Sequence, residues 1–163
     1  MRASIGYFSF LTGCFLITSF LLTPSASGQK DVDFSGWEME SDYNHHYKVT
    51  EQDQIKGTVE DIVGVTPLQG MTPGVGLSIR DQDGDIVQVH LGPKKFVNVD
   101  AIGLRKGDKV KIKGVWASVG GKEVFMASKL KKGENAELKL RRTKDGAPYW
   151  ALSQDDLKKE HEE

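Results

Sequence analysis

The stretch Val75-Gly-Leu-Ser-Ile-Arg-Asp-Gln-Asp-Gly-Asp-Ile-Val-Gln-Val-His-Leu91 decides the fold of this chain. Apolar residues occupy alternate positions on both sides of Asp83-Gly84, as in strands with one buried face. Asp-Gly is also a strong signal for a tight turn between antiparallel strands. We therefore expect a β-hairpin. Its inward residues are Val75, Leu77, Ile79, Val87, Val89 and Leu91, and its outward residues are Ser78, Arg80, Gln88 and His90.

Further alternating stretches predict the remaining strands, at residues 55–60, 109–113, 124–131, 138–142 and 147–151. The last two are expected to form a hairpin through Asp145-Gly146. In the stretch at 124–131, the pattern places Phe125, Lys129 and Lys131 on the outer side.

A long loop at residues 64–74 and a crossover at 94–106 complete the element order of an OB-fold barrel. We expect an all-β protein, with a small OB-fold-like barrel of five to seven strands over residues 55–151. An N-terminal hydrophobic helix precedes this domain. Another small β-barrel or a β-sandwich is the alternative.

The N-terminal residues predict export from the cytoplasm. Arg2 provides a positive start, Ile5–Leu22 is an uncharged and largely apolar run, and Thr23–Gly28 adds small residues. These are the parts of a secretory signal, but the run also approaches the roughly 20 residues that span a bilayer. A cleaved signal peptide and a retained single-span anchor therefore both remain open for residues 1–28. Cys14 is the only cysteine, so no disulfide is expected.

Two polar segments flank the predicted barrel. Residues 29–53 lack a sustained period, and we expect a tether whose aromatic residues dock on the barrel. Residues 152–163 form a polar C-terminal tail, in which Ser153-Gln-Asp-Asp156 is typical of a helix start.

The formal net charge of −1 conceals a strong asymmetry, because residues 94–144 are basic and the regions on either side are acidic. Seven cations fall on the outward phase of predicted strands: Lys109, Lys111, Lys113, Lys129, Lys131, Lys139 and Arg141. On neighbouring strands they would form one basic surface stripe that meets an acidic protein partner or an anionic membrane surface. Alternating lysines also keep barrel edges soluble, and this second interpretation stays open.

Signals for metal chemistry are weaker. Asp81-Gln-Asp-Gly-Asp85 resembles the start of a calcium loop, but Ile86 and Gly92 stand where that loop requires glycine and glutamate. We therefore expect solvated acids in a hairpin turn. His90 is a candidate ligand for iron or copper, although its position predicts a surface histidine. The adjacent His45-His46 pair would point in opposite directions on an extended chain.

The sequence contains none of the common hydrolytic or phosphate-binding motifs, and we expect no enzyme and no obligatory cofactor. The barrel face between Gly64 and Leu91 has no aromatic residue, and its only basic side chain is Arg80. Single-stranded nucleic acid is recognised by stacking aromatics in a cationic groove, so no nucleic-acid partner is expected.

Five phrases of the chain carry a resemblance to known families: Gly70-Met-Thr-Pro-Gly-Val75, Val89-His-Leu-Gly-Pro-Lys-Lys-Phe96, Gly107-Asp-Lys-Val-Lys-Ile112, Ala127-Ser-Lys-Leu-Lys131 and Gly146-Ala-Pro-Tyr-Trp150. They resemble small exported bacterial OB-like proteins, in which Leu-Gly-Pro-x-aromatic is the most specific phrase. Here Lys94 and Lys95 precede the aromatic residue, and Gly76 replaces an expected histidine, which weakens a shared metal role. The chain is also similar to the MamS family of magnetosome-membrane proteins. That resemblance implies a role in magnetite crystal growth and size control.

These observations predict a non-enzymatic OB-like binding or assembly module that is exported or anchored in the inner membrane. The most specific form of this prediction, which the MamS resemblance implies, places the module at the magnetosome membrane. The alternative is a periplasmic metal-handling protein that uses His90. An oligosaccharide or nucleic-acid binder is the remaining interpretation.

Overall fold

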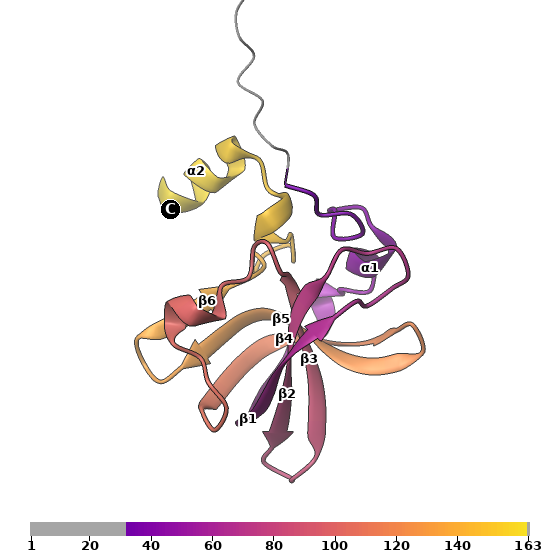
Figure 1. Ribbon diagram of the computed structural model, residues 1–163. Coiled ribbons are helices and arrows are strands. Elements are labelled where there is room, and N and C mark those ends of the chain that lie inside the picture. Colours follow the sequence, from indigo (N-terminus) through magenta and orange to yellow (C-terminus); the bar gives the residue numbers. More distant parts are fainter. Residues whose placement is uncertain (1–31, 163) are drawn as a thin grey trace, which may run out of the picture. The chain divides into compact units, whose positions relative to one another are not determined.

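The computed structural model describes residues 32–162, and β-strands dominate this region (Figure 1). The strands are β1 (Asp53–Val65), β2 (Gly74–Asp81), β3 (Ile86–Pro93), β4 (Lys109–Val119), β5 (Lys122–Lys132) and β6 (Ala136–Lys139). Antiparallel pairing gives the order β3-β2-β1-β4-β5-β6, and a parallel contact between β3 and β5 partly closes the sheet. The predicted all-β barrel is confirmed, and β6 extends it beyond the closed part.

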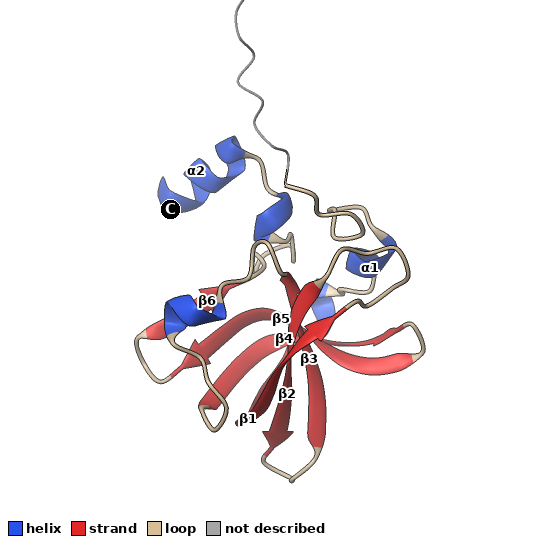
Figure 2. Cartoon of the chain, viewed as in Figure 1, coloured by secondary structure: helices blue, strands red, loops and turns tan. Residues whose placement is uncertain are grey.

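Short helices lie around the barrel (Figure 2). They are α1 (Asp42–His45), the 3-10 helices Val49–Glu51, Val99–Ile102 and Tyr149–Ala151, and α2 (Gln154–Glu162). The backbone N–H of Asp156 donates to Ser153 Oγ at 3.2 Å, which confirms the predicted helix start. Within residues 32–162, no helix is long and apolar enough to cross a bilayer. The predicted leader at residues 1–28 lies outside the described residues.

Alternation along the strands builds the core as predicted. Leu77 and Ile79 of β2 are fully buried, and Val89 of β3 is 1% exposed. Ile112 of β4 and Leu130 of β5 meet them in the barrel interior and are also fully buried. Burial of such a side chain contributes roughly 1.5–3 kcal/mol relative to its exposure, so this interior is a main source of stability.

The segment before β1 is part of the folded domain. Trp37 packs edge-on against Tyr43 and Trp150, with ring centroids 4.8 and 6.0 Å away. Its indole Nε1 donates to the carbonyl oxygen of Thr72 at 2.8 Å, which ties the segment to the loop before β2. We call residues 32–52 the N-terminal cap. The described part of the predicted tether therefore docks on the barrel through its aromatic residues.

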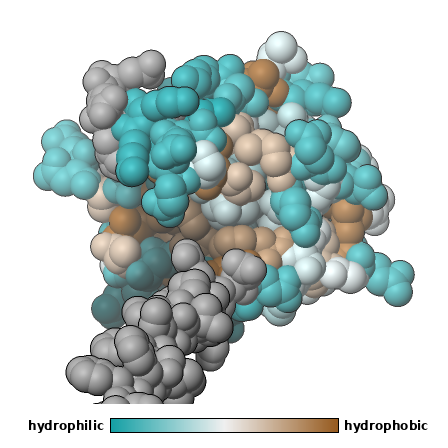
Figure 3. All heavy atoms as spheres, turned by 90° about the horizontal axis from the view of Figure 1, so that it is seen from above, coloured by the Kyte–Doolittle hydropathy of each residue, from teal (hydrophilic) through white to brown (hydrophobic). Residues whose placement is uncertain are grey.

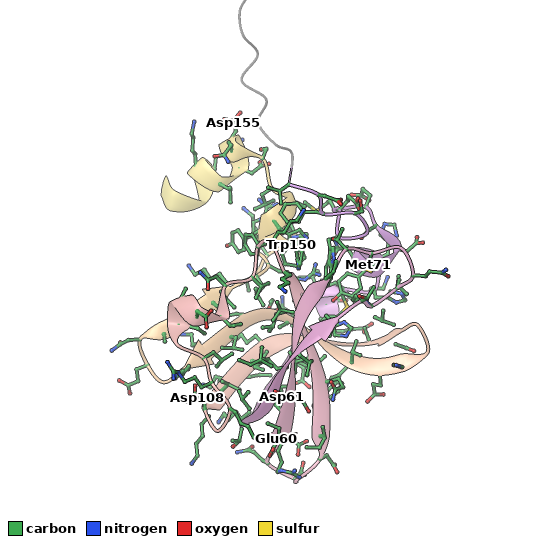
Figure 4. All side chains as sticks on the ribbon, viewed as in Figure 1. Glu60, Asp61, Met71, Asp108, Trp150 and Asp155 are labelled. Carbon is green, nitrogen blue, oxygen red and sulfur yellow. The ribbon has the colours of Figure 1, made fainter. Side chains whose placement is uncertain are left out.

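The cap occupies the end of the barrel at which Trp150 also lies, whereas Asp108 lies toward the other end (Figure 4). Seen from above, hydrophilic side chains surround a smaller apolar area (Figure 3). Both ends of the described chain therefore contribute to one pole of the molecule.

The prediction that Phe125 of β5 lies on the exposed outer side is wrong. It is fully buried and packs edge-on against Trp116, with ring centroids 5.1 Å apart. Both faces of β5 are covered at residues 124–128. Alternation assigns a residue to one side of a strand but does not reveal that another part of the chain covers that side.

The predicted final hairpin is confirmed around its turn, but its two strands do not form. The backbone N–H of Arg142 donates to the carbonyl oxygen of Ala147 at 2.9 Å, and an isolated antiparallel bridge joins Arg141 to Pro148. β6 itself pairs with β5. Proline has no N–H with which to extend a strand ladder. The chain instead forms the 3-10 helix Tyr149–Ala151, in which Trp150 is buried against the cap.

Candidate functional site

Six of the seven predicted surface cations lie on one outer face of the sheet. They come from three neighbouring strands, β4, β5 and β6. Lys56 of β1 adds an exposed side chain directly beside them, in register with Lys111. We call these residues the lysine face: Lys56, Lys109, Lys111, Lys113, Lys129, Lys131 and Lys139.

Strand register places lysines of this face directly opposite one another. Four pairs share the arrangement: Lys56–Lys111, Lys111–Lys131, Lys113–Lys129 and Lys129–Lys139. Like charges at directly opposed positions destabilise a sheet. The lysine face therefore lowers the stability of the fold that displays it.

One carboxylate partly neutralises the face. Glu137 of β6 lies 3.6 Å from Lys129, 3.2 Å from Lys131 and 3.9 Å from Lys139. Partial burial alone raises the pKa of Glu137, but the hydrogen bond from Lys131 and the three lysine charges together lower it. Glu137 is therefore ionised at neutral pH and offsets one of the three positive charges on the β5–β6 side.

The β1–β4 side lacks such a partner. In the described part of the chain, no carboxylate lies within ion-pair distance of Lys56, Lys109, Lys111 or Lys113. All four side chains are exposed. This side therefore presents the uncompensated positive charge of the face.

The lysine face is hollowed. One hollow of about 430 Å³ has five cations in its lining, Lys56, Arg80, Lys109, Lys111 and Lys131, and one carboxylate, that of Asp81. A second hollow of about 210 Å³ is also lined by Lys111 and Lys131. Because these two lysines border both, the hollows are neighbours across β4 and β5. An anionic chain therefore finds adjacent recesses with cationic walls.

A known protein family matches the part of the chain that carries most of this site. Residues 51–137 match the model of the MamS/MamX magnetosome protein family, which is more than half of the chain. This protein belongs to the MamS/MamX magnetosome protein family. The similarity inferred from the sequence is thereby confirmed, and membership associates the protein with the magnetosome. No curated protein matches the chain. The MamS/MamX match includes β1 to β5 and every residue of the lysine face except Lys139.

Arg141, the seventh predicted stripe residue, lies beyond the MamS/MamX match and is only 4% exposed. Its Nη2 donates to Asn44 Oδ1 at 2.6 Å, and its Nη1 donates to the carbonyl oxygen of Gly146 at 3.3 Å. The guanidinium carbon also lies 4.6 Å from the Tyr47 ring centroid and 5.1 Å from that of Trp150. Burial lowers the pKa of Arg141. Its predicted surface position is wrong, because the cap and the 140–150 segment enclose it.

The predicted surface position of His90 is also wrong, because this residue lies under the cap and is 8% exposed. Its Nδ1 is 3.3 Å from the hydroxyl oxygen of Tyr43. Burial lowers the pKa of His90 to about 4, so the ring is neutral at neutral pH. Across the residues that the MamS/MamX protein's structure describes, no group of three or more His, Cys, Asp or Glu side chains is placed to hold a metal ion.

The remaining candidates make local contacts. Asp81 Oδ1 accepts hydrogen bonds from the backbone N–H of Asp83 at 3.0 Å and of Asp85 at 2.9 Å, which confirms a hairpin turn. His45 Nε2 lies 3.5 Å from Glu40, and His46 forms the C-cap of α1. The adjacent histidines therefore lie on a helical turn, where sequence reasoning expected an extended chain.

Proposed function

We propose that this magnetosome protein is a non-enzymatic binding and assembly module whose lysine face binds an acidic segment of a protein partner. In this proposal residues 5–22 export the domain or anchor it in the inner membrane, at the magnetosome membrane. Binding needs no cofactor. Through its partner the protein affects the growth of magnetite crystals.

The opposed lysine pairs carry this proposal. Placing positive charges opposite one another lowers stability, and departures from favourable local pairing concentrate at functional sites. A solubilising role would be met equally well by lysines that face neutral residues. Carboxylates bound between the pairs would relieve their repulsion. Binding would therefore restore the stability that this repulsion removes from the free protein. Glu137 shows within the molecule that a carboxylate fits among three of these lysines.

The shape of the face favours a polypeptide over a membrane. Two neighbouring hollows share Lys111 and Lys131, so successive side chains of an extended acidic segment can enter both. A bilayer is broad, whereas the face lies on the curved outside of a barrel. A membrane would therefore meet fewer of the lysines at once. Binding to anionic vesicles is therefore the alternative outcome of the experiment below.

Fluorescence anisotropy of a labelled oligo-glutamate peptide with the full-length protein in a nonionic detergent tests the proposal. We expect the affinity to fall as salt is added, because these charges are exposed and screened. Replacing Lys109, Lys111 and Lys113 by Gln should weaken binding by at least about tenfold, since three exposed ion pairs are lost.

The matched control replaces Lys94, Lys95 and Lys106 by Gln, which removes the same charge from exposed positions outside the lysine face. This control should leave binding nearly unchanged. Equal losses in both triple variants would reduce the effect to net charge and would contradict the proposal. Binding to anionic vesicles without binding to the peptide would replace the acidic partner by a membrane surface.

A further inference from the structure

The turn between β2 and β3 carries negative charge that the described residues do not neutralise. Figure 1 shows this turn projecting beyond the neighbouring strands. Asp83 and Asp85 are exposed there, and in the described part of the chain neither carboxylate lies within ion-pair distance of a cation. We call residues 82–85 the acidic tip. Its two unpaired carboxylates are the chemical groups that the lysine face is proposed to bind.

Hydrogen bonds across the turn hold the acidic tip in one conformation. The carboxylate of Asp81 accepts from the backbone N–H groups of Asp83 and Asp85. From the other side of the turn, Arg80 Nη1 donates to the carbonyl oxygen of Gly84 at 3.0 Å. Binding of a preorganised turn loses little conformational entropy, so the tip is suited to insertion into a recess.

The acidic tip and the lysine face lie side by side on the molecule. Strand register places Ile86, Arg80, Thr58 and Lys109 in one row, because each is directly opposite the next on β3, β2, β1 and β4. Directly opposed residues lie on the same face of a sheet, and strands are roughly 4.8 Å apart, so the row spans about 14 Å. The base of the tip also borders the hollow of about 430 Å³, since residues 80–82 are part of its lining.

Ile86 adds an apolar surface beside the tip. Its side chain is 48% exposed, whereas the next residue of β3, Val87, is buried. Protein interfaces combine apolar contacts at their centre with charged and polar residues around them. An exposed isoleucine between an acidic tip and a basic hollow has this arrangement.

We propose that the partner of the lysine face is a second copy of this protein, with the acidic tip of each copy in the basic hollow of the other. This inference rests on the function proposed above. Because tip and hollow are adjacent, one two-fold rotation brings both tips to both hollows and closes the assembly at two copies. Asp83 and Asp85 then lie among Lys56, Lys109 and Lys111 of the other copy, where they relieve the repulsion between opposed lysines.

Carbodiimide cross-linking of the full-length protein in a nonionic detergent tests this pairing, because it joins a carboxylate to a lysine amine without a spacer. In a mixture of unlabelled and isotopically heavy protein, mass spectrometry identifies the cross-links that join two copies. We expect links from Asp83 or Asp85 to Lys56, Lys109 or Lys111, in a covalent product of two chains. Cross-links confined to single copies, or a ladder of larger products, would overturn the closed pair.

Exchange of charges gives a sharper test. Replacing Asp83 and Asp85 by Lys should lower the yield of the two-chain product by at least about tenfold, because like charges then face one another. Replacing Lys109 and Lys111 by Glu should have the same effect. A mixture of the two double variants should restore the product, since each tip then meets a hollow of opposite charge. A mixture that stays monomeric would overturn the proposal.

The matched control replaces Asp100 and Glu123 by Lys, which makes the same change of charge at exposed positions outside the tip. This control should keep the two-chain product, and an equal loss would reduce the effect to net charge and overturn the pairing. The tip variant retains its lysine face and should still bind the oligo-glutamate peptide. Peptide binding without cross-links between native copies would overturn the second copy and leave the acidic partner in place. Loss of peptide binding as well would overturn both.

Discussion

The indole Nε1 of Trp150 donates a hydrogen bond to the backbone carbonyl oxygen of Trp37 at 2.7 Å, across a sequence separation of 113 residues. The two rings also pack edge to face. Both residues are buried, and the Trp37 carbonyl also accepts from Asn44 Nδ2 at 2.9 Å. This contact joins the cap before β1 to the segment after β6.

Trp150→Phe should lower the free energy of unfolding by about 1–3 kcal/mol, because it removes a buried hydrogen bond and leaves a gap where part of the indole packed. The Trp37 carbonyl keeps its second donor, Asn44 Nδ2. Urea denaturation measures the change. Trp116→Phe is the control. The indole of Trp116 donates to Asp53 at 3.2 Å, and this residue is 37% exposed. The control should cost less. Equal losses would show that the contact between the two ends adds little.

His90 should make stability depend on pH between about 4 and 6.5. Burial lowers its pKa from 6.5 to about 4, so the unfolded chain binds a proton in this window that the folded protein does not. Stability is therefore present above 6.5 and is lost as the pH falls toward 4. Relative to His90→Gln, the native protein should lose on the order of 3 kcal/mol more over this range. Unfolding curves at several pH values measure the difference.

His45→Gln serves as the control for that experiment, because His45 is exposed on α1. Its pH profile should follow that of the native protein, since this variant keeps the buried His90 ring. Parallel profiles for the native protein and His90→Gln would contradict the buried neutral ring.

Lys111→Glu should stabilise the fold and abolish binding of the acidic peptide. The new carboxylate would face Lys56 and Lys131, so two repulsive pairs become attractive. We expect a gain of about 1 kcal/mol in the free energy of unfolding. Lys122→Glu, at the exposed start of β5 opposite Val119, should change neither quantity much. A Lys111→Glu protein that still binds the peptide would contradict the proposed role of the lysine face.

Glu137→Gln should strengthen peptide binding, because it releases Lys129, Lys131 and Lys139 from their internal partner. The same change should slightly lower stability, as it restores repulsion among these lysines. Anisotropy titrations and urea denaturation measure the two effects on one preparation. Glu134→Gln, in the turn before β6, removes the same charge and should leave affinity unchanged. Weaker binding by Glu137→Gln would mean that this carboxylate helps the partner.

The barrel could be predicted because its signal is local. Alternation places Leu77 and Val89 inward whatever else the chain does, and Asp83-Gly84 marks the turn between their strands. The opposition of Lys56 to Lys111 could not be predicted in this way, because it depends on the register between β1 and β4. Alternation alone does not specify that register.

The buried positions of His90 and Arg141 have a different cause. Both lie on segments whose outer side is covered by distant parts of the chain, including Tyr43, Tyr47 and Trp150. The aromatic residues of the predicted tether were the available signal for such a cover. Their partners were not evident, since nothing in the spacing of Tyr43 indicates that it meets His90.

The parallel contact between β3 and β5 is the weakest seam of the barrel. It consists of the pairs Val89–Phe125 and His90–Met126, whereas β4 and β5 pair along nearly their whole length. Elements with few mutual hydrogen bonds open without global unfolding. Amide hydrogens along this seam should therefore exchange before those of β4. Tyr43 of the cap packs against His90 at this seam. The cap therefore limits local opening of the barrel between β3 and β5.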